Sequence, residues 1–235
     1  MIPLHDDNPT RITPFVTIGL IASCVAVFFY QVSLGSRGGE MFVYRYGALP
    51  AVIFGRESLP RDVVALPASF SLVTSMFLHG GFLHLFGNML YLWIFGNNIE
   101  DAMGHARFII FYLVCGVLAA MTHALSDPAS TLPMIGASGA ISGVLGAYLL
   151  IYPRARVLML VPIWIFIRLF YMPAWVALGI WFLFQVLASL GPAGGGGVAI
   201  FAHIGGFVAG MALIGIFKDK RVRFFNPPHR SARYR

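Results

Sequence analysis

Three apolar stretches of the sequence carry side chains that could take part in acyl-transfer chemistry. One contains Ser138, a second contains His84 and Asn88, and a third contains His203. A serine beside a histidine is the minimum for nucleophilic catalysis, because the imidazole accepts the hydroxyl proton during attack and returns it to the leaving group. No carboxylate in these stretches is placed to complete a triad, so the pattern favours a Ser138–His203 dyad.

An acyl-transfer site also needs hydrogen-bond donors directed at the developing oxyanion. His84 and Asn88 lie four residues apart and therefore share one face of a helix. We expect these two side chains and the backbone amide of Ser138, assisted by a helix dipole, to supply the donors. Taken singly, a serine in a glycine-rich helix usually serves packing, and we interpret His79 as structural or interfacial. The combination of residues favours chemistry.

The composition places these residues in a membrane. Of the 235 residues, 58% are hydrophobic and 11% are charged, and the mean hydropathy is +0.80. Soluble domains carry about 25% charged residues, whereas a span needs roughly 20 apolar residues. We therefore expect an all-α, polytopic membrane protein with six transmembrane helices. The expected spans are 14–34, 83–99, 106–126, 137–152, 173–190 and 200–217.

The spans define an N-terminal tail (1–13), a membrane domain (14–217) and a basic C-terminal tail (218–235). Twelve Lys and Arg residues fall on the expected N-terminal side and four on the other, so the positive-inside rule predicts that both termini are cytoplasmic. The long first loop mixes charges with aromatics, as expected of an amphipathic loop in the interface. Segment 157–170 is too short in its apolar part to span and is interpreted as interfacial.

Glycines at helical spacing accompany the candidate dyad. Those of the fourth expected span cluster near the face of Ser138, and those of the sixth lie on the side of His203. Small residues let two helix backbones approach closely in a bilayer, so packing of these glycines would bring the hydroxyl within reach of the imidazole. The glycines are Gly139, Gly143, Gly146, Gly206 and Gly210.

The ordered set of motifs resembles the rhomboid family of intramembrane serine proteases, in its bacterial type. The motifs are "HGGFLHLFGN" with His84 and Asn88, "EDAMGHARF" after the second span, "GASG" around Ser138, and "AHIGG" with His203. The resemblance implies a rhomboid-like bundle in which Ser138 is the nucleophile and His203 the base. It also implies that His84, Asn88 and the Ser138 amide form the oxyanion hole, and that Gly136 shapes the approach to the nucleophile.

The resemblance further implies a multi-pass protein of the bacterial inner membrane. Such a protein cleaves single-span transmembrane substrates within or near the lipid bilayer, without a metal or cofactor. Two positions depart from the family pattern. Ser142 stands where many bacterial relatives place an aromatic residue that stacks on the histidine, so Ser142 or a water is expected to hold His203 instead. The Trp-Arg pair often seen in the first loop is missing, since no Trp precedes Trp93.

Three alternatives stay open at this point. A catalytically silent rhomboid-like binder of client transmembrane helices typically lacks the serine or the histidine, and both are present. A transporter or channel would be expected to show an internal repeat and paired broken helices, which we do not find. A metalloprotease is disfavoured because neither His79 nor His84 belongs to an HExxH motif. We expect no nucleic-acid partner, and Cys24 and Cys115 are interpreted as small core residues rather than a disulfide.

Overall fold

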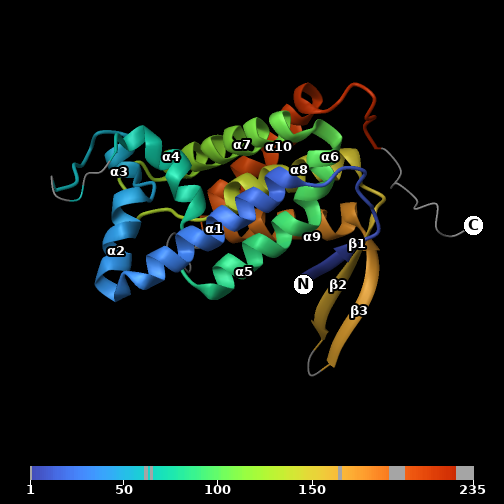
Figure 1. The fold of residues 1–235 in the computed structure, drawn as a ribbon, viewed down its shortest axis with the longest axis horizontal. Coiled ribbons are helices and arrows are strands. Elements are labelled where there is room, and N and C mark those ends of the chain that lie inside the picture. The colour runs from blue at the N-terminus through green and yellow to red at the C-terminus, as the bar shows by residue number, and fades with distance from the viewer. Residues whose placement is uncertain (1, 61–62, 64–65, 164–165, 191–198, 226–235) are drawn as a thin grey trace, which may run out of the picture.

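The computed structural model describes residues 2–60, 63, 66–163, 166–190 and 199–225. This part of the chain is mostly helical, and a small sheet lies at one end of a bundle of helices (Figure 1). Residues 226–235 of the predicted basic tail lie outside the described residues.

Six apolar helical segments correspond in position to the six expected spans. They are α1 (Phe15–Ser33), the continuous segment of α5 (Phe82–Tyr91), the π-helical turn η3 (Leu92–Gly96) and α6 (Asn97–Met103), α7 (His105–Ser126), α8 (Ser138–Ile151), α9 (Ala174–Ser189) and α10 (Ile200–Phe217). The helices α1, α7 and α10 are each long and apolar enough to cross a membrane, and α8 and α9 are shorter. The segment 82–103 gives a fourth span if it is counted with the helical stretch before it, from which it bends by 84°. The described residues thus hold three or four spans by length, and a bundle of six stays a prediction.

The expected first loop is a chain of short helices at the end of the bundle opposite the sheet (Figure 1). These helices are α2 (Gly35–Tyr46), α3 (Pro50–Ile53), η1 (Ala68–Phe70), α4 (Ser71–Thr74) and η2 (Ser75–Phe77). The loop returns to the bundle next to α8, where the backbone N–H of Gly136 donates to the carbonyl of Ser75 at 2.9 Å. The loop therefore supports the segment that leads into Ser138.

A three-stranded antiparallel sheet corrects the all-α prediction. Its strands, in the order β1-β2-β3, are β1 (Ile2–Asp6), β2 (Arg156–Ile163) and β3 (Phe166–Pro173). Of segment 157–170, predicted only as interfacial, residues 157–163 and 166–170 belong to the antiparallel strands β2 and β3, which agrees with the β-branched and aromatic residues of the segment. The tail 1–13 supplies β1, in which Ile2 pairs with Leu160 of β2.

The helix α8 lies at the centre of the core, and eleven of its fourteen residues are buried. It packs against α10 with almost no space between the two backbones. A Cβ added at Gly206 would lie 2.0 Å from the carbonyl oxygen of Gly139, and one added at Gly210 would lie 1.9 Å from that of Gly143. Because any side chain there would collide with backbone, these glycines determine how near α10 comes to α8.

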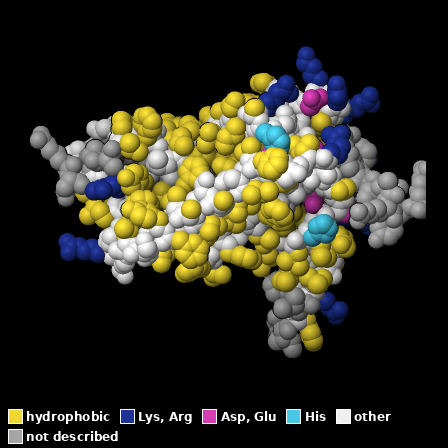
Figure 2. Space-filling view, in the orientation of Figure 1, with side chains coloured by type: hydrophobic (Ala, Val, Ile, Leu, Met, Phe, Trp, Pro, Cys, Tyr) yellow, Lys and Arg dark blue, Asp and Glu magenta, His cyan; other side chains and the backbone are white. Residues whose placement is uncertain are grey.

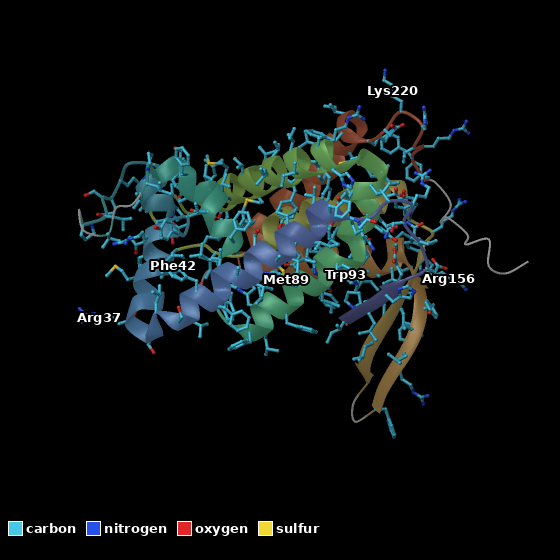
Figure 3. All side chains as sticks on the ribbon, in the orientation of Figure 1. Arg37, Phe42, Met89, Trp93, Arg156 and Lys220 are labelled. Atoms are coloured by element: carbon cyan, nitrogen blue, oxygen red, sulfur yellow. The ribbon has the colours of Figure 1, made fainter. Side chains whose placement is uncertain are left out.

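We call the end of the bundle that carries the sheet the basic end. Lys and Arg side chains gather there, whereas apolar side chains cover the middle of the bundle (Figure 2). Arg156 and Lys220 lie at this end and Arg37 at the opposite one (Figure 3). Both termini of the described chain also lie here, since the backbone N–H of Phe225 donates to Leu150 and that of Asp7 to Arg156.

Two buried carboxyl groups fasten the basic end. Glu100 accepts hydrogen bonds from the backbone amides of Val16 and Thr17, at 2.9 and 2.8 Å, and so satisfies donors in the first turn of α1. The Thr17 hydroxyl adds a bond of 2.7 Å. Asp6 of β1 accepts a hydrogen bond of 2.5 Å from the Tyr148 hydroxyl on α8. These contacts tie the N-terminal segment to the helices.

Candidate active site

Ser138 and His203 meet at the beginning of their helices, in the half of the bundle away from the basic end. Ser138 is the first residue of α8, and His203 lies in the first turn of α10. The Nε2 atom of His203 lies 2.8 Å from the hydroxyl oxygen of Ser138. The contact follows from the glycine packing. Gly139 follows Ser138 in α8, and Gly206 lies one turn after His203 in α10, so the close approach of the two backbones at these glycines brings the hydroxyl and the imidazole together.

The helix α9 holds the other side of the histidine ring. The Nδ1 atom of His203 lies 2.8 Å from the side-chain oxygen of Gln185. The Trp181 ring lies against the imidazole at a centroid distance of 5.9 Å. The sequence interpretation missed both residues, although a glutamine in an apolar helix is the kind of polar residue that marks a functional site in a membrane.

Ser142 does not contact the histidine in the way the sequence suggested. Its hydroxyl donates a hydrogen bond of 2.7 Å to the carbonyl oxygen of Ser138, one turn earlier in α8. The Ser142 hydroxyl therefore bonds within its own helix, as serine side chains in helices often do. Gln185 and Trp181, rather than Ser142, contact the ring of His203.

His84 and Asn88 on α5 face the space beside Gly136. The backbone N–H of Gly80 donates to Nδ1 of His84 at 3.2 Å, so Nδ1 is the acceptor and Nε2 carries the proton of the neutral ring. The side-chain nitrogen of Asn88 is buried and has no hydrogen-bond partner among the described residues. Both groups are therefore donors that are free to bind an oxygen atom.

Gly136 leaves room for that oxygen. Its φ is +122°, a conformation that L side chains rarely adopt. A Cβ at this position would lie 2.8 Å from Nε2 of His84 and 3.7 Å from the side-chain nitrogen of Asn88. The absence of a side chain thus keeps both donors open beside the segment that leads into Ser138.

A cavity of about 520 Å³ connects these groups. It lies between α5, α8, α9 and the start of α10, and apolar side chains form much of its wall. Its polar lining residues are His84, Asn88, Tyr91, Ser138, Ser142, Trp181 and His203. A serine, a histidine and two free donors around one cavity are the parts that acyl transfer requires.

Other candidate residues have structural surroundings. His79 is buried, its Nδ1 lies 3.3 Å from the carbonyl of Phe77, and its own carbonyl accepts a bond from Gln31. Cys24 and Cys115 are buried and unpaired, as predicted. Among the described residues, His, Cys, Asp and Glu form no group of three that could hold a metal ion.

Residues 68–220, about two thirds of the chain, match the family model of the Rhomboid domain. Rhomboid protein 1, mitochondrial, of Saccharomyces cerevisiae is 32% identical over 201 residues, which cover 77% of this chain and 54% of the yeast protein. RHOMBOID-like protein 5 of Arabidopsis thaliana is 36% identical over 92 residues, or 39% of this chain and 30% of the plant protein. Rhomboid protease GluP of Bacillus subtilis is 33% identical over 137 residues, or 58% of this chain and 24% of GluP.

This chain spans about half or less of the length of these curated relatives. The relatives come from a yeast, a plant and a bacterium, so the bacterial type stays a prediction. The matched region contains each residue of the candidate site, from His84 to His203. The apolar helices and the family model together lead to one conclusion: the chain is a multi-pass integral membrane protein and belongs to the Rhomboid family.

Proposed function

We propose that this protein is an intramembrane serine endopeptidase that acts through Ser138 and His203. The observation that carries the proposal is the 2.8 Å contact between the Ser138 hydroxyl and Nε2 of His203, within an apolar bundle. The family adds support, because one relative is named a rhomboid protease. The silent-binder alternative is less well supported, since both members of the dyad are present and in contact.

The proposed reaction uses groups that already face one another. The hydroxyl oxygen of Ser138 attacks the carbonyl carbon of the scissile peptide, and its proton passes to Nε2 of His203. Nε2–H of His84, the Asn88 amide and the Ser138 backbone N–H stabilise the oxyanion. His203 then gives the proton to the leaving amine, and the peptide bond breaks. A water then gives a proton to His203 and adds to the acyl carbon. The bond to the Ser138 oxygen breaks, and His203 returns the proton to that oxygen.

The substrate we propose is the transmembrane segment of a single-span membrane protein. The proposed topology has six spans, with both termini in the cytoplasm of a bacterial cell. Both described ends of the chain and the basic side chains share one end of the bundle, which supports an even number of crossings and the positive-inside orientation. Ser138 and His203 then lie in the outward half of the membrane.

A fluorophosphonate probe tests the proposal, because it reacts with activated serines. We expect the purified protein in detergent to be labelled and to cleave a single-span model substrate. Both activities should be lost in Ser138→Ala and His203→Ala. Ser126→Ala, which removes an exposed hydroxyl at the end of α7, is the matched control and should behave as wild type.

Two outcomes would contradict the proposal. Equal labelling of wild type and Ser138→Ala would place the reactive serine elsewhere. A wild-type protein that captures the single-span segment in detergent without labelling or cleavage would instead support the silent-binder alternative.

A further inference from the structure

The second half of α9, residues 181–189, which we call its outer half, contacts α10 through Trp181, Phe182 and Gln185. The buried residues of α9 are Ala174, Ala177 and Leu178, all in its first two turns next to the sheet. Farther along the helix, Phe182 stacks on Phe207 of α10 with ring centroids 4.5 Å apart. One turn beyond Trp181, Gln185 reaches His203. The position of the outer half of α9 relative to α10 is therefore linked to contacts with the histidine.

The contact with Gln185 has a defined hydrogen-bond direction. The side-chain oxygen of Gln185 faces Nδ1 of His203 and accepts, which assigns the proton of the neutral ring to Nδ1. In the neutral imidazole, Nε2 then holds the free lone pair, and this atom faces the Ser138 hydroxyl. A ring with the opposite tautomer would present N–H to Ser138 and could not accept its proton.

No other described contact supplies this acceptor. The serine at position 142, where the family pattern often has an aromatic, uses its hydroxyl on the carbonyl of Ser138. Nor does Gln185 line the cavity in which the substrate would lie. Gln185 thus contacts the proposed base from the side opposite the nucleophile, without contacting the site of the peptide.

We propose that Gln185 is a positioning residue, which holds His203 in the tautomer and ring orientation that accept the Ser138 proton. Because Gln185 belongs to α9, it can hold His203 in this way only while the outer half of α9 lies against α10. This inference rests on the proposed function of Ser138 and His203.

Two substitutions of similar size separate positioning from packing. Gln185→Met keeps the length of the side chain but removes the acceptor, whereas Gln185→Glu keeps an acceptor at Nδ1. If Gln185 positions the base, Gln185→Met lowers kcat about tenfold, the factor that a typical net hydrogen bond represents. KM should stay unchanged because Gln185 does not line the cavity, and Gln185→Glu should keep more activity than Gln185→Met.

A packing role predicts the opposite order, because Met suits an apolar helix and a carboxylate does not. Activity of Gln185→Met equal to or above that of Gln185→Glu would therefore overturn the proposal. The matched control is Leu187→Met, an exposed position on the same helix, which should leave kcat and KM as in wild type. Melting temperatures in detergent verify that each variant is folded.

A double-mutant cycle tests the dependence on α9. Phe182→Leu weakens the stacking on Phe207 and should lower kcat in the wild-type background. In the Gln185→Met background the same change should have little further effect, since the contact that transmits it is gone. Fully additive effects on kcat would overturn the coupling.

Ser138→Ala in the same assay keeps the two proposals apart. Inactive Ser138→Ala together with wild-type kcat in Gln185→Met would overturn only the role of Gln185. Active Ser138→Ala would overturn the proposed function and this inference with it.

Discussion

The carboxyl group of Asp6, near the start of the chain, accepts a 2.5 Å hydrogen bond from the hydroxyl of Tyr148 on the helix that begins with Ser138. The side-chain nitrogen of Asn98 donates a second bond to the same oxygen at 3.1 Å. The first strand of the sheet is thereby joined to the central helix of the core. The contact has consequences for stability, because Asp6 is buried.

Burial raises the pKa of Asp6 to about 7, although the hydrogen bond from Tyr148 lowers it in part. A carboxyl group with a raised folded pKa binds more protons in the folded than in the unfolded state, between about pH 4 and pH 7. We therefore expect the free energy of unfolding to fall as the pH rises through this window and to level off above pH 7. The expected loss is on the order of a few kcal/mol.

Asp6→Asn should remove this fall, because the amide does not titrate. The measurement is the melting temperature in detergent from pH 5 to pH 8. Asp7→Asn, which changes the neighbouring carboxylate that pairs with Arg156, is the control and should keep the fall. A wild-type protein whose stability rises across this range would contradict the prediction.

Gly210→Ala should destabilise the protein and abolish its activity. The added Cβ would lie 1.9 Å from the carbonyl oxygen of Gly143, so α10 must shift away from α8 and His203 with it. We expect a loss of about 1–3 kcal/mol or more, measured as a lower melting temperature, together with loss of fluorophosphonate labelling.

Gly215→Ala is the control on the same helix. Its Cβ would meet the nearest atom, in the ring of Phe224, at an ordinary distance of 3.5 Å. This variant should be neutral or slightly more stable, because alanine favours a helix more than glycine does. Equal melting temperatures and labelling of the two variants would contradict the prediction that Gly210 determines how near α10 comes to α8.

Glu100→Gln should lower stability by about 1.5–3 kcal/mol, the range for hydrogen bonds to a charged group. The carboxylate of Glu100 is fully buried and accepts three hydrogen bonds from Val16 and Thr17, whereas an amide presents one oxygen to the same donors. The melting temperature in detergent measures the effect. Glu40→Gln removes an exposed carboxylate of α2 and should change the melting temperature little.

Asn88→Ala should slow cleavage of a single-span substrate without abolishing it. One oxyanion donor contributes about 2.7–4 kcal/mol at most to the stability of the transition state, or a factor of about 10² to 10³ in kcat. His84 and the Ser138 amide would remain as donors. Unchanged kcat in Asn88→Ala would remove this residue from the proposed oxyanion hole, whatever the behaviour of Ser138→Ala.

The sequence alone determined the parts that depend on local spacing. Apolar runs locate the six helical segments, and four-residue spacing puts His84 and Asn88 on one face of α5. The glycines of α8 and α10 also lie at helical spacing, which makes a close approach of the two helices possible. These features follow from helix geometry and the absence of side chains, and both can be read along the chain.

Only the tertiary structure decided which distant groups meet. Ile2 and Leu160 pair across the sheet although nothing local joins them, so the tail and the interfacial segment could not be recognised as partners. Ser142 points to its own helix and Gln185 points to His203, because helix rotation and placement decide which side chains face the histidine. Residue type and spacing supply the groups, and packing between helices selects their partners.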